Sequence, residues 1–185
     1  MQTITIAIPY YCNPAMLEKQ IKTWNFYPIE AKQSLKFIVV DDGSPYPAKT
    51  DWHADFDLEM YRIKEDIPWN RTGALNLAVD RAKTSHVWFI DIDHILPPEY
   101  TLPLVITPQE AKTIEIIKRY RLFTEEPLKI EERPASTYLV KMNRQEFIDL
   151  GMWDEDFAGG YAMEGLWLWE CAKKQGFKEV IRNDV

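Results

Sequence analysis

The sequence predicts an α/β fold in which a mostly parallel sheet is flanked by helices, in a single compact domain over residues 1–185. Two observations carry this prediction. Over the first 93 residues, apolar runs too short for helices alternate with amphipathic helical segments, as in strand–helix–strand units. A length of 185 residues also suits one domain with a substantial core and is too short for two comfortable domains.

The chain opens with strand-like and helix-like segments in turn. Thr3 to Pro9 is β-branched and ends at a proline, as a first strand would. Asn13 can cap a helix that begins at Pro14, because proline suits the first helical position. Phe37 to Val40 is a second strand, and Glu59 to Ile63 is expected to be a short strand, at an edge or between the second strand and the next helix.

The next unit ends in two carboxylates. A helix from Thr72 to Lys83 and a buried strand from Val87 to Ile90 lead directly into Asp91 and Asp93. Ligands of open α/β sheets bind where strands end, and acidic residues are poor strand formers. Carboxylate oxygens suit Mg²⁺ or Mn²⁺, which would hold the phosphates of a nucleotide. The alternative is a strand-terminating turn, in which Asp is common.

The pattern changes after Pro97. The expected elements are, in order, a helix after the capping box Thr107–Glu110, a strand at Tyr120–Phe123, a loop at Thr124–Pro134, a strand at Ser136–Met142, a short helix capped by Asn143, and a helix at Met163–Gln175. Glu164 lies near the start of the last helix, where the helix dipole favours an ionised carboxylate. Trp167 and Trp169 cannot both face the core, so one of them is expected in a cleft or exposed.

Composition limits the partners. A net charge of −7 and a pI near 5.1 argue against a nucleic-acid partner, although a bound metal could still hold a nucleotide. Cys12 and Cys171 fit reduced thiols better than a disulfide framework. No apolar run reaches the roughly 18 to 20 residues of a membrane span, so we expect a cytoplasmic protein.

Taken in order, these segments resemble the inverting nucleotide-sugar glycosyltransferases of the Rossmann-like GT-A fold, in particular family 2 and the related galactosyltransferase group. The resemblance rests on ITIAIPYY (4–11), FIVVDDGSP (37–45), WNR (69–71) with ALNLA (74–78), DID (91–93), FIDLGMWDEDF (147–157) and GGYAME (159–164). Agreement of several weak motifs in one order is hard to obtain by chance. It implies a nucleotide-binding half over 1–98 and an acceptor and catalytic half over 99–185.

The resemblance also implies roles for residues of the first half. Pro9 and Tyr11 would line the pocket for the nucleobase, and Asp42 would accept a hydrogen bond from the base or ribose. Arg71 would neutralise the diphosphate or hold the Asp-x-Asp loop in place. The alternatives are an ordinary rim aromatic for Tyr11, turn formation for Asp42 and a solvated charge for Arg71.

The metal would be Mn²⁺ or Mg²⁺. In such a site Asp91 would face the ribose and the metal, and Asp93 would bind the metal directly, with His94 as a candidate further ligand. The late histidine that often completes this site in the family is missing, and Asp184 is a candidate substitute.

The implied activity is that of an inverting, hexosyltransferase-like enzyme. It would move a sugar from a nucleotide donor, most simply a UDP sugar, to the hydroxyl of a glycan or other acceptor, with Glu164 as the base. One departure counts against this: the family usually has Glu-Asp here, with Asp as the base, whereas Gly165 follows Glu164. The alternative is therefore a non-catalytic sugar-nucleotide or glycan binding module of the same fold. A nucleotidyltransferase is disfavoured because YYCNPA (10–15) has no glycine and no lysine.

Overall fold

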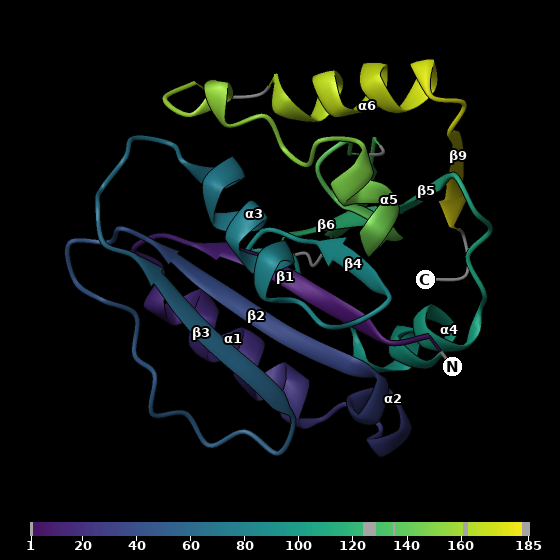
Figure 1. The fold of residues 1–185 in the computed structure, drawn as a ribbon. Helices are drawn as coiled ribbons and strands as arrows, with labels where there is room; N and C mark the ends of the chain where they lie inside the picture. Colours follow the sequence, from purple (N-terminus) through teal and green to yellow (C-terminus); the bar gives the residue numbers. More distant parts are fainter. Residues whose placement is uncertain (1, 124–128, 135, 161–162, 183–185) are drawn as a thin grey trace.

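The structure is a computed structural model that describes residues 2–123, 129–134, 136–160 and 163–182. These residues form a seven-stranded sheet of order β3-β2-β1-β4-β8-β5-β9 and a separate hairpin of β6 and β7 (Figure 1). The strands are β1 Ile4–Tyr10, β2 Leu35–Asp42, β3 Asp57–Ile63, β4 His86–Phe89, β5 Thr113–Ile117, β6 Arg119–Phe123, β7 Lys129–Arg133, β8 Val140–Asn143 and β9 Lys178–Arg182. The helices are α1 Pro14–Asn25, α2 Ile29–Ser34, α3 Arg71–Arg81, α4 Thr101–Ile106, α5 Arg144–Asp149 and α6 Glu164–Lys174, with 3-10 turns η1 Pro98–Tyr100 and η2 Glu155–Phe157.

The sheet is mostly parallel, as the sequence predicts. β1 pairs in parallel with β2 and β4, β2 with β3, and β5 with β9. Among the described strands of this sheet, β8 alone runs antiparallel to both of its neighbours, β4 and β5. Because β1, β2 and β4 run the same way, their carboxyl ends meet at one edge of the sheet.

Apolar side chains pack on both faces of the sheet. Helices α1 and α3 lie on opposite faces of the sheet (Figure 1). In β1, Ile4 and Ile6 belong to the core cluster that contains residues of α1, whereas Ala7 belongs to the cluster that contains residues of α3. The same division continues along β2, where Phe37 contacts Trp24 of α1 with 4.4 Å between ring centroids. Burial on both faces explains why these strands appear in the sequence as continuous apolar runs rather than alternating ones.

Two expectations for the second half are wrong. The segment after Thr107–Glu110 is not a helix, since Thr113–Ile117 is strand β5 between β8 and β9. All five of its side chains are buried, so β-branched residues that fit a helical period are held by the sheet instead. Lys129–Arg133, expected to lie in a loop, is strand β7, which pairs with β6. The short helices α2 and α4 were not predicted.

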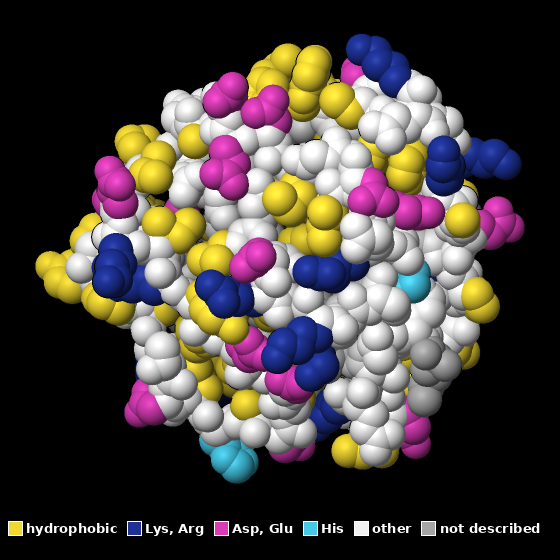
Figure 2. Space-filling model, viewed as in Figure 1, with side chains coloured by type: hydrophobic (Ala, Val, Ile, Leu, Met, Phe, Trp, Pro, Cys, Tyr) yellow, Lys and Arg dark blue, Asp and Glu magenta, His cyan; other side chains and the backbone are white. Residues whose placement is uncertain are grey.

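The surface mixes charges of both signs. On the face in Figure 2, the Lys and Arg side chains of the described residues are interspersed with Asp and Glu, and no continuous basic area appears there. Within the described part of the chain, no helix combines the length and apolar character needed to cross a membrane.

Candidate functional site

A cavity of about 580 Å³ lies where β1, β2 and β4 end. The cavity is lined by the residues that the sequence assigns to the nucleotide and to catalysis and by Asp91 and Asp93 of the proposed metal site, although Pro9 and Glu164 come from opposite ends of the chain. His94, the candidate further metal ligand, is not among the lining residues. The lining residues are Pro9, Tyr10, Tyr11, Asn13, Asp42, Asp66, Ile67, Pro68, Trp69, Arg71, Asp91, Ile92, Asp93, Tyr138 and Glu164. Asp184, the substitute metal ligand suggested by the sequence, lies outside the described residues.

The two acids at the end of β2 have different tasks. Asp41 is buried and accepts hydrogen bonds from the backbone amides of Ser44 and Ala48, each at 2.9 Å, which fixes the turn after the strand. Asp42 instead lines the cavity and accepts a hydrogen bond of 3.1 Å from the side chain of Asn70. Burial raises the pKa of Asp42 to about 6, against the opposing hydrogen bond from Asn70.

Gly43 allows this turn to close. Its φ is +73°, and a β-carbon there would lie 2.5 Å from the carbonyl oxygen of Glu65. The backbone after β2 can therefore approach the loop that contains Asp66. The Tyr11 hydroxyl donates a hydrogen bond of 3.2 Å to Asp66, so this loop forms one wall of the cavity with Tyr11.

Arg71 links three parts of the site from the first turn of α3. Its Nε donates to Asp91 at 2.8 Å and its Nη2 donates to the carbonyl of Tyr138 at 3.2 Å. The guanidinium also lies over the rings of Tyr138 and Trp153, with 5.4 and 5.6 Å to the ring centroids. A planar, permanently charged group is suited to this position because it can stack and donate at once. Arg71 therefore contacts the first acid of the Asp-x-Asp turn, while its role toward a diphosphate stays a prediction.

Glu164 is the first residue of α6 and is only 3% exposed. Its Oε1 lies 3.9 Å from Nη1 of Arg71, and its Oε2 accepts no hydrogen bond from a described residue. The next position has no room for a side chain, since a β-carbon on Gly165 would lie 2.6 Å from Oγ1 of Thr137 and 2.9 Å from the ring of Tyr138. An aspartate at this position would therefore collide with Thr137 and Tyr138 unless that segment shifted.

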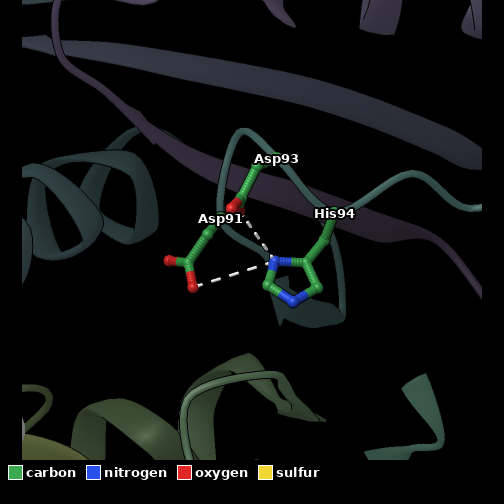
Figure 3. Close-up of side chains that lie close together, drawn as sticks. All are labelled: Asp91, Asp93 and His94. Atoms are coloured by element: carbon green, nitrogen blue, oxygen red, sulfur yellow. Dashed lines mark ion pairs between the residues drawn. The ribbon is translucent and has the colours of Figure 1, made fainter. Parts of the chain in front are cut away.

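Asp91, Asp93 and His94 form a cluster that fits a divalent cation (Figure 3). Each offers one ligand atom, and these atoms all lie within 4.8 Å of one another. Nδ1 of His94 is 3.1 Å from Asp93 and 3.9 Å from Asp91. The nearby imidazole of His94 lowers the pKa of Asp93. Two carboxylates and an imidazole form a donor set that Mn²⁺ and Mg²⁺ accept.

Sequence reasoning missed several residues that build the site. Gln20 of α1 is fully buried and donates to the carbonyls of Ile92 and His94, at 2.9 and 2.6 Å, so it fixes the turn that carries the metal cluster. The available signal was a polar residue beside Leu17 and Ile21 on the apolar face of that helix. Asp66 and Tyr138 carry no such signal, because both come from irregular segments that only the tertiary fold brings to the cavity.

Solved structures share this fold. GalNAc-T7 with UDP, GalNAc and Mn²⁺ superposes with a TM-score of 0.73 at 12% identity, covering 98% of this chain and 42% of that one. The mannosyltransferase PcManGT from Pyrobaculum calidifontis, in complex with GDP-Man and Mn²⁺, gives 0.72 at 17% identity, covering 100% and 55%. TarS of S. aureus, residues 1–349, gives 0.66 at 15% identity, covering 99% and 58%. The chain thus spans about half the length of these proteins.

The likeness confirms the predicted GT-A fold. At the level of sequence, no curated protein matches the chain significantly. The model of the family described as "Glycosyl transferase family 2" matches residues 5–162, which is most of the chain. The chain belongs to glycosyl transferase family 2.

Proposed function

We propose that this chain transfers a hexosyl group from a nucleotide sugar, most simply a UDP sugar, to an acceptor hydroxyl with inversion at the anomeric carbon. The observation that carries the proposal is the single cavity of about 580 Å³ into which Asp42, Arg71, Asp91, Asp93 and Glu164 converge. This reaction needs an acceptor for the nucleobase, a positive charge beside the diphosphate, ligands for a metal ion and a general base, all in one cavity.

The nucleobase lies against Pro9 and Tyr11, with Asp42 as the acceptor for the imide N–H of uracil. An ionised Asp42 is acceptor-only, which matches a base that presents a donor at that position. Asp66 lines the same wall and is a second acceptor within reach of the base or ribose.

The diphosphate lies near Arg71 and the cluster of Asp91, Asp93 and His94, which would hold Mn²⁺ or Mg²⁺. Such an ion supplies Lewis-acid stabilisation of the negative charge on the leaving nucleoside diphosphate. One Asp91 oxygen is held by Arg71, and the other lies on the side of His94. Arg71 therefore keeps Asp91 oriented and places a positive charge beside the leaving group.

Glu164 accepts the proton of the acceptor hydroxyl. As that proton leaves, the acceptor oxygen forms a bond to the anomeric carbon, and the bond from this carbon to the diphosphate oxygen breaks. The products are the new glycoside, the nucleoside diphosphate and protonated Glu164, which returns its proton to water. No second carboxylate is needed on α6, and Gly165 leaves no space for one.

The alternative is a binding module of the same fold that transfers no sugar, and the absence of the usual aspartate after Glu164 favours it. Glu164→Gln separates the two functions. For an enzyme, the variant binds UDP and Mn²⁺ as the parent does but transfers sugar at least about a hundredfold more slowly, as expected when a general base is lost. The matched control is Glu170→Gln, an exposed position on the same helix.

The donor site is tested separately by calorimetric titration with UDP and GDP, with and without Mn²⁺. We expect metal-dependent binding of UDP that is lost in Asp93→Ala. Binding of neither nucleotide under any condition would remove the donor site, and with it the proposed reaction.

A further inference from the structure

A second cavity of about 400 Å³ lies between α3, α6 and the segment that joins α5 to η2. It shares no lining residue with the donor cavity. Its walls are formed by Asn76, Leu150, Gly151, Met152, Trp153, Asp154, Glu155, Trp167, Leu168 and Cys171. Roughly 300 to 1,000 Å³ is the usual size of a small-molecule site, so this cavity is large enough for one ring-sized ligand.

Trp167 gives this cavity an accessible aromatic face. Its side chain is 46% exposed, whereas Trp169 on the same helix is buried, so the sequence expectation that one of the two leaves the core is confirmed. Hydrophobic side chains gather over α6 at the top of Figure 2, and Met163, Leu166 and Trp167 are its exposed large apolar residues. An indole offers a broad apolar face beside polar neighbours, which is the surface that the C–H face of a pyranose requires.

Polar groups line the same cavity as Trp167. Oε1 of Glu155 accepts a hydrogen bond of 2.8 Å from Nδ2 of Asn76, which is itself buried, and this bond fixes the position of the Glu155 carboxylate. Asn76 also exchanges hydrogen bonds with the backbone of Trp153, so the cavity wall is rigid. A fixed carboxylate with a remaining acceptor oxygen suits a sugar hydroxyl.

The second cavity lies close to the reaction centre. Trp167 follows Glu164 by three residues, so less than one turn of about 5.4 Å separates them along α6. Trp167 and Glu164 therefore lie close to each other along the axis of α6, although they line different cavities.

We propose that this second cavity is an acceptor subsite that binds a pyranose ring, with Trp167 stacking on the sugar and Glu155 accepting from its hydroxyls. The inference rests on the proposed function, because it names the acceptor as a glycan whose reactive unit reaches Glu164. The inference predicts a sugar acceptor. Simple alcohols and protein side-chain hydroxyls are not expected to bind here, because they have no pyranose ring that could stack on Trp167.

The test uses the full chain with ¹⁵N-labelled tryptophan, so that each indole N–H gives an NMR signal. The probes are the methyl glycosides of glucose, galactose, mannose and N-acetylglucosamine. We expect at least one to shift the Trp167 indole signal saturably, and Glu155→Gln to weaken that binding about tenfold, a loss of roughly 1.4 kcal/mol. Leu166→Ala is the matched control, because Leu166 is exposed on the same helix but lies outside the cavity.

The outcomes distinguish this inference from the proposed function. If UDP binds with Mn²⁺ but no glycoside shifts Trp167, the subsite is refuted and the donor site stands. If glycosides bind at Trp167 but no nucleotide binds, the saccharide site stands and the proposed transfer is refuted. With both in place, Trp167→Ala raises the KM for a glycan acceptor while the Kd for UDP and the kcat stay unchanged. A Trp167→Ala variant with an unchanged acceptor KM would overturn the subsite as well.

Discussion

Replacing Gly165 by alanine tests whether the start of α6 tolerates any side chain. Helix propensity alone favours alanine by up to about 1 kcal/mol. The contacts oppose it, since the new β-carbon would lie 2.6 Å from Oγ1 of Thr137, 2.9 Å from the ring of Tyr138 and 3.0 Å from the carbonyl oxygen of Thr137. The hydroxyl can rotate away, but the carbonyl cannot without a backbone shift, and overpacking of this kind costs roughly 1–3 kcal/mol.

We therefore expect Gly165→Ala to lower the free energy of unfolding by about 1–2 kcal/mol, or the Tm by roughly 2–8 °C for a chain of this length. Thermal unfolding followed by circular dichroism measures this change. Because the ring of Tyr138 packs against Arg71, a displaced ring also weakens the binding of UDP and Mn²⁺. Gly165→Asp, which restores the usual acid of the family, is expected to lose both stability and nucleotide affinity.

The matched control is Gly160→Ala. A β-carbon there meets nothing closer than the carbonyl oxygen of Phe157 at 3.7 Å, so its stability should stay the same or rise slightly. A Gly165→Ala variant that is as stable as the parent and binds UDP equally well would refute the reasoning, because the Thr137–Tyr138 segment would then be free to move aside.

Three further predictions concern charged groups. Burial raises the pKa of Asp42 to about 6, and the ionised carboxylate is a stronger acceptor for an imide N–H than the protonated carboxyl, so affinity for UDP should fall as the pH drops below 6. The ratio of Kd values for the parent and Asp42→Asn cancels the titration of UDP itself. A ratio that stays constant between pH 5 and 7.5 would contradict this role. Arg71→Lys should weaken the binding of UDP and Mn²⁺ at least about tenfold in calorimetry, because lysine cannot both hold Asp91 and stack on the neighbouring aromatic rings. An unchanged affinity would show that the contact between Arg71 and Asp91 does not contribute to binding. Glu115→Gln removes the carboxylate that the fully buried Lys141 and the buried Arg182 share, at 2.9 and 3.0 Å, and should cost about 3–5 kcal/mol in denaturant unfolding. A loss below about 1 kcal/mol would show that other contacts of these cations compensate the change.

The first half of the fold could be predicted from the sequence more completely than the second half. Pro9, Asp42 and Asp91 follow apolar runs that had to be strands, and parallel strands bring such positions to one edge. Local sequence pattern and tertiary geometry agree there. The strand β5 was missed because TIEII is buried on both faces, and an apolar run of that kind has no alternation to distinguish it from a buried helix.

Other parts of the site depend on long-range contacts that no local pattern contains. The hydrogen bonds of Gln20 reach across more than 70 residues to the turn after β4. The contact of Arg71 with Tyr138 joins the start of a helix to an irregular segment before β8. Such partners are selected by the packing of whole elements, so residue type and spacing along the chain do not determine them.

At two places, the structure gives a physical reason why the assigned residue, and not its neighbour in the chain, is available to a ligand. At the end of β2, both carboxylate oxygens of Asp41 are used by backbone amides, so only Asp42 is free for a ligand. At the start of α6, packing leaves room for a side chain at Glu164 and none at Gly165. A shift of one residue at either place would break a turn or create a clash. The assignment of Asp42 and Glu164 to the site therefore rests on what their neighbours must do to maintain the fold, and this basis is independent of any motif.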